Sequence, residues 1–196
     1  MVASLPPIIF LRHGETDWNA VGRLQGRKDI PLNDRGRVQA QRNGAAIAAA
    51  YPEISEFDFV ASPLGRTRET MEIARAAMSL DPSSYALEER LVELGWGEWE
   101  GFTNEELRAR SPEEMAAREA DRWRHVPPGG ESYELVLGRI EPWLFSLKRP
   151  TVVVSHGGVG RVLRARLLAL DPTTAMGGIF TQDSAFHWHR GAETPI

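Results

Sequence analysis

An arginine, a histidine and a glycine stand side by side as Arg12, His13 and Gly14, directly after the apolar run 8–11. Arginine offers a planar fork of N–H donors for phosphate oxygens, histidine a nucleophilic imidazole, and glycine a backbone that a ligand can approach closely. Arg66 follows a second apolar stretch, 57–63, where a helix would begin and its N-terminus would favour negative charge. These residue types suit the binding of a dianion.

A third apolar stretch, "TVVVSHGG" (151–158), ends in a similar group, formed by Ser155, His156, Gly157 and Gly158. Short Val, Ile and Phe runs separated by helical stretches are typical of parallel strands joined by crossover helices. The carboxyl ends of parallel strands lie at one edge of a sheet, where open α/β sheets bind ligands. We therefore expect the three strand ends to converge on one site.

The elements that must position these groups fit a single α/β domain over residues 1–196. The length and the hydrophobic content of 42% allow a substantial core. We predict a three-layer sandwich with a mostly parallel central sheet flanked by helices. Helices are expected over 34–50, capped by Asn33, over 63–78, with Ser62 as cap and Pro63 in the first helical position, and over 132–147. Apolar residues at helical spacing predict another helix after residue 158.

Two further segments differ from this pattern. Residues 103–128 contain "TNEE" and "SPEE", which resemble capping boxes, and predict a helical excursion over one end of the sheet. The stretch "SAFHWHR" (184–190) predicts a late edge strand with His187 and His189 on one face. A metal site needs three or four ligands, so this pair indicates a solvated strand face, and we predict no metal.

Charge and composition exclude several classes of function. There are 23 basic and 27 acidic residues, and the net charge of -4 argues against nucleic acid as a partner. Cysteine is absent, which excludes disulfides and thiolate chemistry and fits a reducing compartment. The first residues lack a basic leader and are interrupted by Pro6 and Pro7, so we expect neither a signal peptide nor a membrane span. The expected location is cytoplasmic, and both a monomer and a dimer remain open.

The motifs taken together resemble the histidine phosphatase (phosphoglycerate mutase-like) superfamily, and in that family's order they cover nearly the whole chain. They are "IIFLRHGETDWN", "LQGRKDIPLNDRGRVQA", "ASPLGRTRET", "ERLVELGWGEWEG", "PGGES" and "VVVSHGG". The resemblance implies that His13 is the nucleophile and becomes phosphorylated, and that Glu93 is the proton donor. It places Arg12, Arg66 and His156 in the phosphate pocket. Asn19, Gln25, Gly26 and the backbone at Gly157 are expected to approach the phosphoryl or substrate oxygens, with Ser155 beside them.

The chemistry implied by this resemblance is phosphoryl transfer without a metal or other cofactor. The site must position its groups and stabilise charge on the equatorial oxygens, and two arginines and a protonated His156 would supply that charge. An acid must protonate the leaving alkoxide, and the same carboxylate can then take a proton from the attacking water. We expect a phosphomonoester hydrolase acting on a small phosphorylated metabolite.

Two alternatives come from other classes of function. One is a cofactor-dependent phosphoglycerate mutase, and the other is a phosphoprotein phosphatase or a module that only binds phosphorylated partners. Mutases of the family typically carry an arginine and a tyrosine after the acid and a longer insertion, whereas here Leu94, Gly95 and Trp96 follow Glu93. The full set of catalytic residue types disfavours the binding module.

Substrate preference is expected to depend on the helical excursion 103–128. Arg122, Arg124 and His125 form a basic group that could contact a second negative charge on the substrate, although charge clusters are more often solvated helix ends. Trp96, Trp99 and Trp123 could form an aromatic wall, although core packing is the commoner use of tryptophan.

Overall fold

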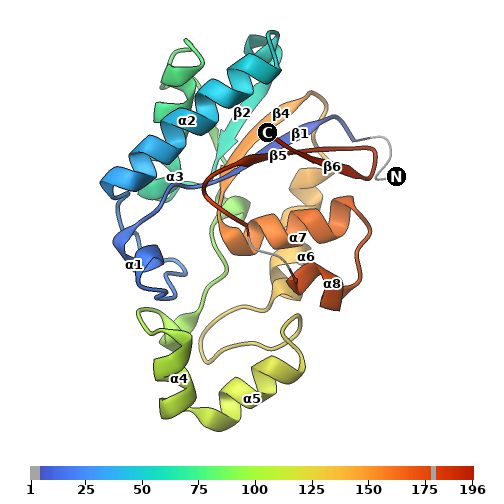
Figure 1. Cartoon of the computed structure of the whole chain (residues 1–196). Helices are drawn as coiled ribbons and strands as arrows, with labels where there is room; N and C mark the ends of the chain where they lie inside the picture. Colours follow the sequence, from blue (N-terminus) through green and yellow to red (C-terminus); the bar gives the residue numbers. More distant parts are fainter. Residues whose placement is uncertain (1–4, 178–179) are drawn as a thin grey trace.

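A six-stranded mixed sheet forms the centre of the protein in a computed structural model that describes residues 5–177 and 180–196 (Figure 1). The strand order is β3-β2-β4-β1-β5-β6. The strands are β1 (Ile8–Arg12), β2 (Asp58–Ala61), β3 (Ala86–Leu87), β4 (Thr151–Ser155), β5 (Ala185–His189) and β6 (Ala192–Pro195). The first four run parallel, whereas β5 and β6 are antiparallel to their neighbours. The mostly parallel sheet predicted from the sequence is confirmed. The expectation about the N-terminal segment falls partly on residues 1–4, which lie outside the described residues.

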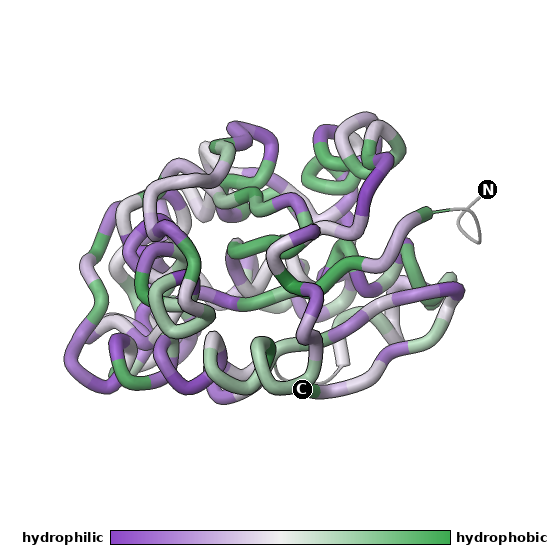
Figure 2. Tube along the Cα trace, turned by 90° about the horizontal axis from the view of Figure 1, so that it is seen from above, coloured by the Kyte–Doolittle hydropathy of each residue, from purple (hydrophilic) through white to green (hydrophobic). Residues whose placement is uncertain are grey.

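Helices cover both faces of the sheet and produce three layers (Figure 1). Successive side chains of a strand point to opposite faces, and β1 shows the consequence. Ile8 and Phe10 pack in one buried cluster with α6 (Tyr133–Leu144), α7 (Gly157–Leu167) and α8 (Pro172–Met176). Ile9 and Leu11 pack in the other with α2 (Asp34–Ala50) and α3 (Gly65–Ala77). In Figure 2 the trace is hydrophobic along the central strands and largely hydrophilic over the outer loops.

Two helices begin with a side-chain N-cap at the positions where the sequence predicts a helix to start. α2 begins after Asn33, whose side chain accepts a hydrogen bond from the Gly36 N–H at 2.9 Å, as expected. α6 begins after Ser132, whose hydroxyl accepts from Leu135 N–H at 3.1 Å. Helix α6 ends at Leu144 instead of residue 147. The chain then forms a turn in which the Ser146 hydroxyl donates a hydrogen bond to the Trp143 carbonyl at 2.7 Å.

The predicted start of α3 is wrong. The helix begins at Gly65 and Ser62 does not cap it. The Ser62 hydroxyl lies 2.8 Å from His156 Nε2, and a carboxylate oxygen of Asp29 accepts from the Gly65 N–H at 2.8 Å. Asp29, which is distant in sequence, therefore accepts a hydrogen bond from a free N–H at the start of α3. The Ser62 hydroxyl is then available to contact His156 at the end of the strands.

The excursion stands away from the sheet and contains α4 (Asn104–Arg110) and α5 (Pro112–Ala120) (Figure 1). Thr103 and Glu106 form the capping box expected of "TNEE", whereas Ser111, whose ψ of 64° departs from the extended conformation of an N-cap, makes no side-chain cap at "SPEE". Trp99, Leu107 and Met115 form a small buried cluster of their own. The short elements α1 (Asp17–Ala20), η2 (Ile54–Glu56), η3 (Glu89–Leu91) and η4 (Gly97–Trp99) complete the fold.

The prediction that β5 is an edge strand is also wrong, because β6 pairs with it and forms the edge. His187 and His189 do share a face, with ring centroids 6.1 Å apart. Within residues 5–177 and 180–196, no group of three or more His, Cys, Asp and Glu side chains is arranged to hold a metal ion. Nor does any helix in these ranges combine the length and apolar character needed to cross a membrane.

Candidate active site

A polar cavity of about 190 Å³ opens at the carboxyl end of the parallel strands. The sequence-predicted residues that line it are Arg12, His13, Asn19, Gln25, Gly26, Arg66, Glu93 and Gly157. They come from the ends of β1 and β4, from α1 and the loop that follows it, from the first turn of α3 and from the loop between η3 and η4. The expected convergence of the strand ends is therefore observed, with β1 and β4 paired so that Arg12 lies opposite Ser155.

His13 is held in one tautomer at the end of β1. Its Nδ1 donates to the Gly14 carbonyl at 2.8 Å, and its backbone N–H donates to the Ser155 carbonyl at 2.9 Å. The Gly14 N–H in turn donates to the Thr70 hydroxyl of α3 at 3.0 Å. Burial, followed by the charges of Arg66 and Arg12, lowers the pKa of His13 well below its ordinary value of 6.5. A neutral imidazole with its proton on Nδ1 presents a lone pair on Nε2, as nucleophilic attack requires.

Two arginines converge on this imidazole, and each keeps an unpaired donor. Arg12 Nη1 donates to the Phe180 carbonyl at 2.8 Å, whereas Arg66 donates to the carbonyls of Lys28 and Gly26 at 2.7 and 2.9 Å. The Nε atoms of both arginines are buried and have no hydrogen-bond partner among the described residues. Burial lowers the pKa of Arg12 to about 10, against an opposing effect of Glu93. Buried cationic donors without partners are strongly unfavourable until an anion binds them.

His156, the N-cap of α7, lies behind His13 with the two ring centroids 5.2 Å apart. Its Nε2 contacts the Ser62 hydroxyl, and its Nδ1 is buried without a partner in the described part of the chain. Burial, followed by the charges of Arg66, His13 and Arg12, lowers the pKa of His156 well below 6.5. These effects disfavour an imidazolium at this position in the free protein, whereas the protonated His156 expected from the sequence belongs to the site with a phosphoryl group bound.

The Glu93 carboxylate lies at the N-terminus of α7 and lines the cavity. Its oxygens accept from the Gly158 N–H at 3.1 and 3.2 Å and from its neighbour Leu94 N–H at 2.9 Å. A Cβ at residue 158 would lie 2.5 Å from the Glu93 oxygen, so only glycine lets the carboxylate reach the helix end. Among the acids of 88–100, Glu93 is the one that lines the cavity.

The other predicted ligands differ in their placement. Asn19 lines the cavity, but its side-chain oxygen accepts from Gln182 Nε2 at 2.8 Å. Gln25 is buried, and its side-chain oxygen has no hydrogen-bond partner in the described part of the chain; rotation of the amide would present its NH₂ group to an anion instead. Ser155 is not a lining residue, because its hydroxyl donates to the Leu91 carbonyl at 2.8 Å. Its contribution is the carbonyl that holds the His13 backbone.

Four lining residues were not predicted from the sequence: Arg23, Leu24, Tyr133 and Arg161. Arg161 lies one helical turn after Gly157, a spacing that could have revealed it, since both residues share a helix face. Its Nε is buried and unpaired within the described ranges. Arg118 of α5 is only 9% exposed, has no ion pair or hydrogen bond in the described part of the protein, and stacks over Trp96 at 5.2 Å.

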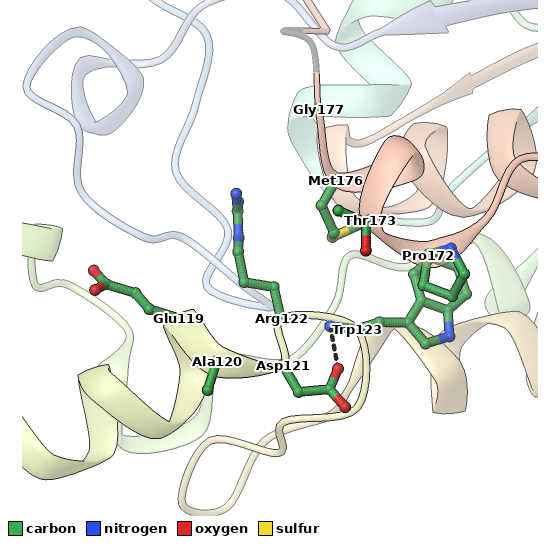
Figure 3. Close-up of a pocket in the computed structure, with 9 residues that line it drawn as sticks. All are labelled: Glu119, Ala120, Asp121, Arg122, Trp123, Pro172, Thr173, Met176 and Gly177. Carbon is green, nitrogen blue, oxygen red and sulfur yellow. Dashed lines mark hydrogen bonds between the residues drawn. The ribbon is translucent and has the colours of Figure 1, made fainter.

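The basic group expected at the mouth is not arranged as predicted. Arg124 is exposed and pairs with Asp121 and Glu134, whereas His125 stacks against Trp99 with ring centroids 5.5 Å apart. Arg122 lines a different cavity of about 320 Å³, between the end of the excursion and α8 (Figure 3).

Of the three tryptophans that could have formed an aromatic wall, Trp96 alone lines the polar cavity. Trp99 and Trp123 are buried in hydrophobic clusters. The predicted tryptophan wall is therefore reduced to Trp96, over which Arg118 stacks, and Tyr133 is the second aromatic residue that lines the cavity in the described part of the chain.

Comparison with known proteins agrees with this geometry. Residues 8–184 match the model of the histidine phosphatase superfamily (branch 1). The chain is 35% identical over 187 residues to a glucosyl-3-phosphoglycerate phosphatase of Mycolicibacterium vanbaalenii, covering 88% of this chain and 79% of the relative. It is 33% identical over 175 residues to phosphoserine phosphatase 1 of Hydrogenobacter thermophilus, covering 84% and 77%. A solved mycobacterial glucosyl-3-phosphoglycerate phosphatase in complex with VO3 matches with a TM-score of 0.77 at 31% identity, over 93% of this chain and 92% of that one.

Proposed function

The chain belongs to the histidine phosphatase superfamily and is a phosphoric monoester hydrolase, and we propose that it acts through a phosphohistidine formed on His13. The observation that carries this proposal is the fixed tautomer: Nδ1 donates to the Gly14 carbonyl, which leaves the Nε2 lone pair for attack. Arg12 and Arg66 line the same cavity as His13, and each has a buried Nε without a hydrogen-bond partner among the described residues.

The two half-reactions use these residues in turn. Nε2 of His13 attacks the phosphorus, the bond from phosphorus to the ester oxygen breaks, and protonated Glu93 gives its proton to the leaving alkoxide. Water then attacks the phosphohistidine and gives a proton to the Glu93 carboxylate as the P–N bond breaks. Arg12 and Arg66 stabilise the equatorial oxygens throughout, and such fixed donors contribute most of the stabilisation in phosphoryl transfer.

We also propose that the substrate, a small phosphorylated metabolite, carries a second negative charge. Arg161 lines the cavity, and its charge contributes to lowering the pKa of Arg118, although burial is the largest cause. Arg118 stacks over Trp96, which lines the same cavity as Arg161. Neither arginine has an acidic partner in the described residues, so a carboxylate or second phosphate would supply the missing counter-charge. In this proposal, residues 103–128 set substrate preference through Arg118.

The mechanism is tested with phosphate release from p-nitrophenyl phosphate and from alkyl phosphates. His13→Asn, whose amide can replace the Nδ1 donor, is expected to abolish turnover and the covalent phosphoprotein seen by mass spectrometry. Glu93→Gln is expected to slow alkyl esters by about 100-fold and p-nitrophenyl phosphate much less, since that leaving group hardly needs a proton. A phosphorylated His13→Asn protein would refute the nucleophile. Interconversion of 2- and 3-phosphoglycerate without phosphate release would identify a mutase.

The second charge is tested separately with Arg118→Met and Arg161→Met. Each is expected to lower kcat/KM for 3-phosphoglycerate by about 10-fold or more, because a charged hydrogen bond contributes about 1.5–3 kcal/mol, while p-nitrophenyl phosphate changes little. Arg124→Met is the matched control, since Arg124 already has acidic partners. Equal losses on both substrates would contradict the second-charge proposal and leave the phosphohistidine mechanism intact.

A further inference from the structure

The proton donor proposed above is carried by a segment with little regular structure. Glu93 lies between the end of η3 at Leu91 and the start of η4 at Gly97. Its carboxylate is fixed to the N-terminus of α7, but its backbone belongs to neither helix. A proton donor must be held within hydrogen-bond reach of the leaving oxygen, so the backbone at 90–95 needs its own support.

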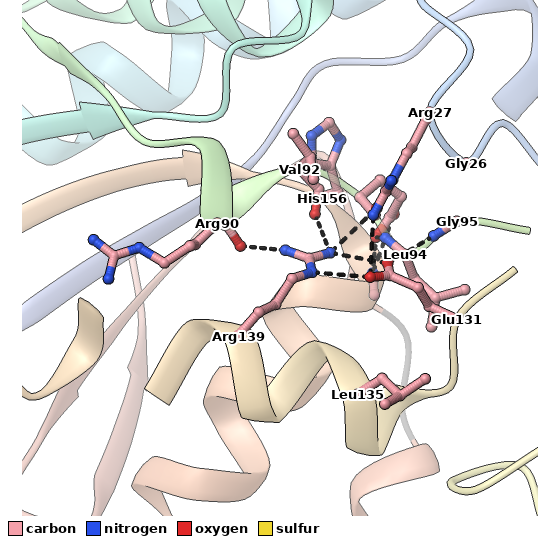
Figure 4. Close-up of polar contacts among 12 residues, drawn as sticks. Gly26, Arg27, Arg90, Val92, Leu94, Gly95, Glu131, Leu135, Arg139 and His156 are labelled. Carbon is pink, nitrogen blue, oxygen red and sulfur yellow. Dashed lines mark hydrogen bonds and ion pairs between the residues drawn. The ribbon is translucent and has the colours of Figure 1, made fainter. Parts of the chain in front are cut away.

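Arg139 of α6 supplies part of that support (Figure 4). Its Nη2 donates to the Val92 carbonyl at 2.7 Å and to the Glu93 carbonyl at 3.3 Å, and its Nη1 donates to the Arg90 carbonyl. One guanidinium thus binds the backbone on the N-terminal side of the acid and at the acid itself. The planar fork of arginine is suited to holding several carbonyls at once.

Glu131, the acid of the "PGGES" motif, binds the backbone on the C-terminal side of Glu93. Its carboxylate accepts from the Gly95 N–H at 3.2 Å, and its backbone N–H donates to the Gly95 carbonyl at 2.8 Å. The same carboxylate pairs with Arg139 at 3.3 Å (Figure 4). Burial raises the pKa of Glu131, but Arg139 and the Gly95 N–H outweigh it, so the net pKa lies below its ordinary value.

Glu131 also reaches the phosphate-binding side of the cavity. Its carboxylate pairs with Arg27 at 3.0 Å. Arg27 follows Gly26, whose carbonyl accepts a hydrogen bond from Arg66, one of the two arginines of the proposed phosphate pocket. A single carboxylate therefore connects the acid-bearing segment with the turn that holds an arginine of the phosphate pocket.

We propose that Glu131 and Arg139 are positioning residues that fix the proton donor Glu93 relative to the phosphate pocket. This inference rests on the proposed role of Glu93. It gives the "PGGES" motif a function in the protonation step, because the pair contacts the backbone at 90–95 on both sides of the acid and at the acid itself, while neither of the two residues lines the phosphate cavity.

The test measures leaving-group dependence in Arg139→Gln and Glu131→Gln. Both variants are expected to lower kcat for an alkyl phosphate by about 10- to 100-fold, because small misplacements of a catalytic group have effects of that size. The kcat for p-nitrophenyl phosphate and the KM of both esters are expected to change by less than about threefold. In the Glu93→Gln background, Arg139→Gln should add no further dependence on the leaving group, since both changes then affect the same step.

Arg164→Gln is the matched control. Arg164 pairs with Glu193 at 2.9 Å, and the side chains of that pair are 27% and 20% exposed, compared with 19% and 20% for Arg139 and Glu131. It should affect both esters alike. If Glu93→Gln slows alkyl esters selectively but Arg139→Gln and Glu131→Gln slow both esters equally, the positioning role is refuted. If Glu93→Gln shows no selectivity, the proposed acid itself fails, and the two failures are thus distinguished.

Discussion

Acidification is expected to destabilise the free protein through two buried histidines. His13 is 2% exposed and His156 is fully buried, and the pKa of each lies well below 6.5, chiefly because of burial. Below pH 6.5 the unfolded chain binds protons at these positions that the folded protein does not bind. Stability from this source is therefore fully present above pH 6.5 and falls as the pH decreases.

The size of the effect follows from proton linkage. Between about pH 7.5 and about pH 5.5, a histidine that stays neutral in the folded state lowers the free energy of unfolding by about 1.4 kcal/mol, and the two together by about 2.7 kcal/mol. The assay is urea unfolding across this range in buffers without oxyanions, because an anion bound in the pocket would itself stabilise the folded state.

Carboxylates and the remaining histidines contribute to the same pH dependence, so a double variant is needed to isolate the two residues. His13→Asn can keep the donor at the Nδ1 position, and His156→Gln can keep a polar group near the Ser62 hydroxyl. The double variant is expected to lose about 2.7 kcal/mol less than the wild type over the same interval. Identical losses in the two proteins would show that the histidines titrate normally when folded and would refute the reasoning.

Three further expectations concern packing, capping and metal dependence. Gly44→Ala places a Cβ 2.4 Å from the Ala74 carbonyl, between α2 and α3, and should cost about 2 kcal/mol or more of unfolding free energy. Gly138→Ala, with nothing within 4 Å, should stabilise by about 0.5–1 kcal/mol in the same urea assay. Thr103→Ala should lower the hydrogen-exchange protection of α4 by about 1 kcal/mol, whereas Ser111→Ala, which removes no cap bond, should leave α5 unchanged. Phosphate release should persist after dialysis against EDTA, since among the described residues four arginines and only one carboxylate, Glu93, line the cavity; a loss restored by a divalent cation would contradict this.

The convergence of the strand ends could be predicted from the sequence because it depends on local signals and one topological rule. Apolar runs mark the strands, and parallel strands present their carboxyl ends at one edge. Arg12, His13 and Arg66 follow from that rule alone. The choice of Glu93 among neighbouring acids does not, because it depends on which carboxylate reaches the N-terminus of α7.

The errors arise where a tertiary contact outweighs a local preference. Ser62 has the right type and position for a helix cap, but His156 engages its hydroxyl. The edge position of β5 was mispredicted because β6, with the polar sequence "AETP", carries no strand pattern. The contacts of Arg139 with 90–95 span more than forty residues of sequence and leave no local signal.

The separate hydrophobic cluster of the excursion has an evolutionary consequence. Helices α4 and α5 pack around Trp99, Leu107 and Met115, and Trp96 packs against both this cluster and the core on the α6 and α7 face of the sheet, so the folding of the two helices draws mainly on a small local cluster. Mutations in this region can therefore accumulate, and the region can be exchanged between homologues or shuffled in a library, with the strand-end chemistry left in place. Selection can therefore change substrate preference through residues 103–128 while the residues at the strand ends keep the same reaction.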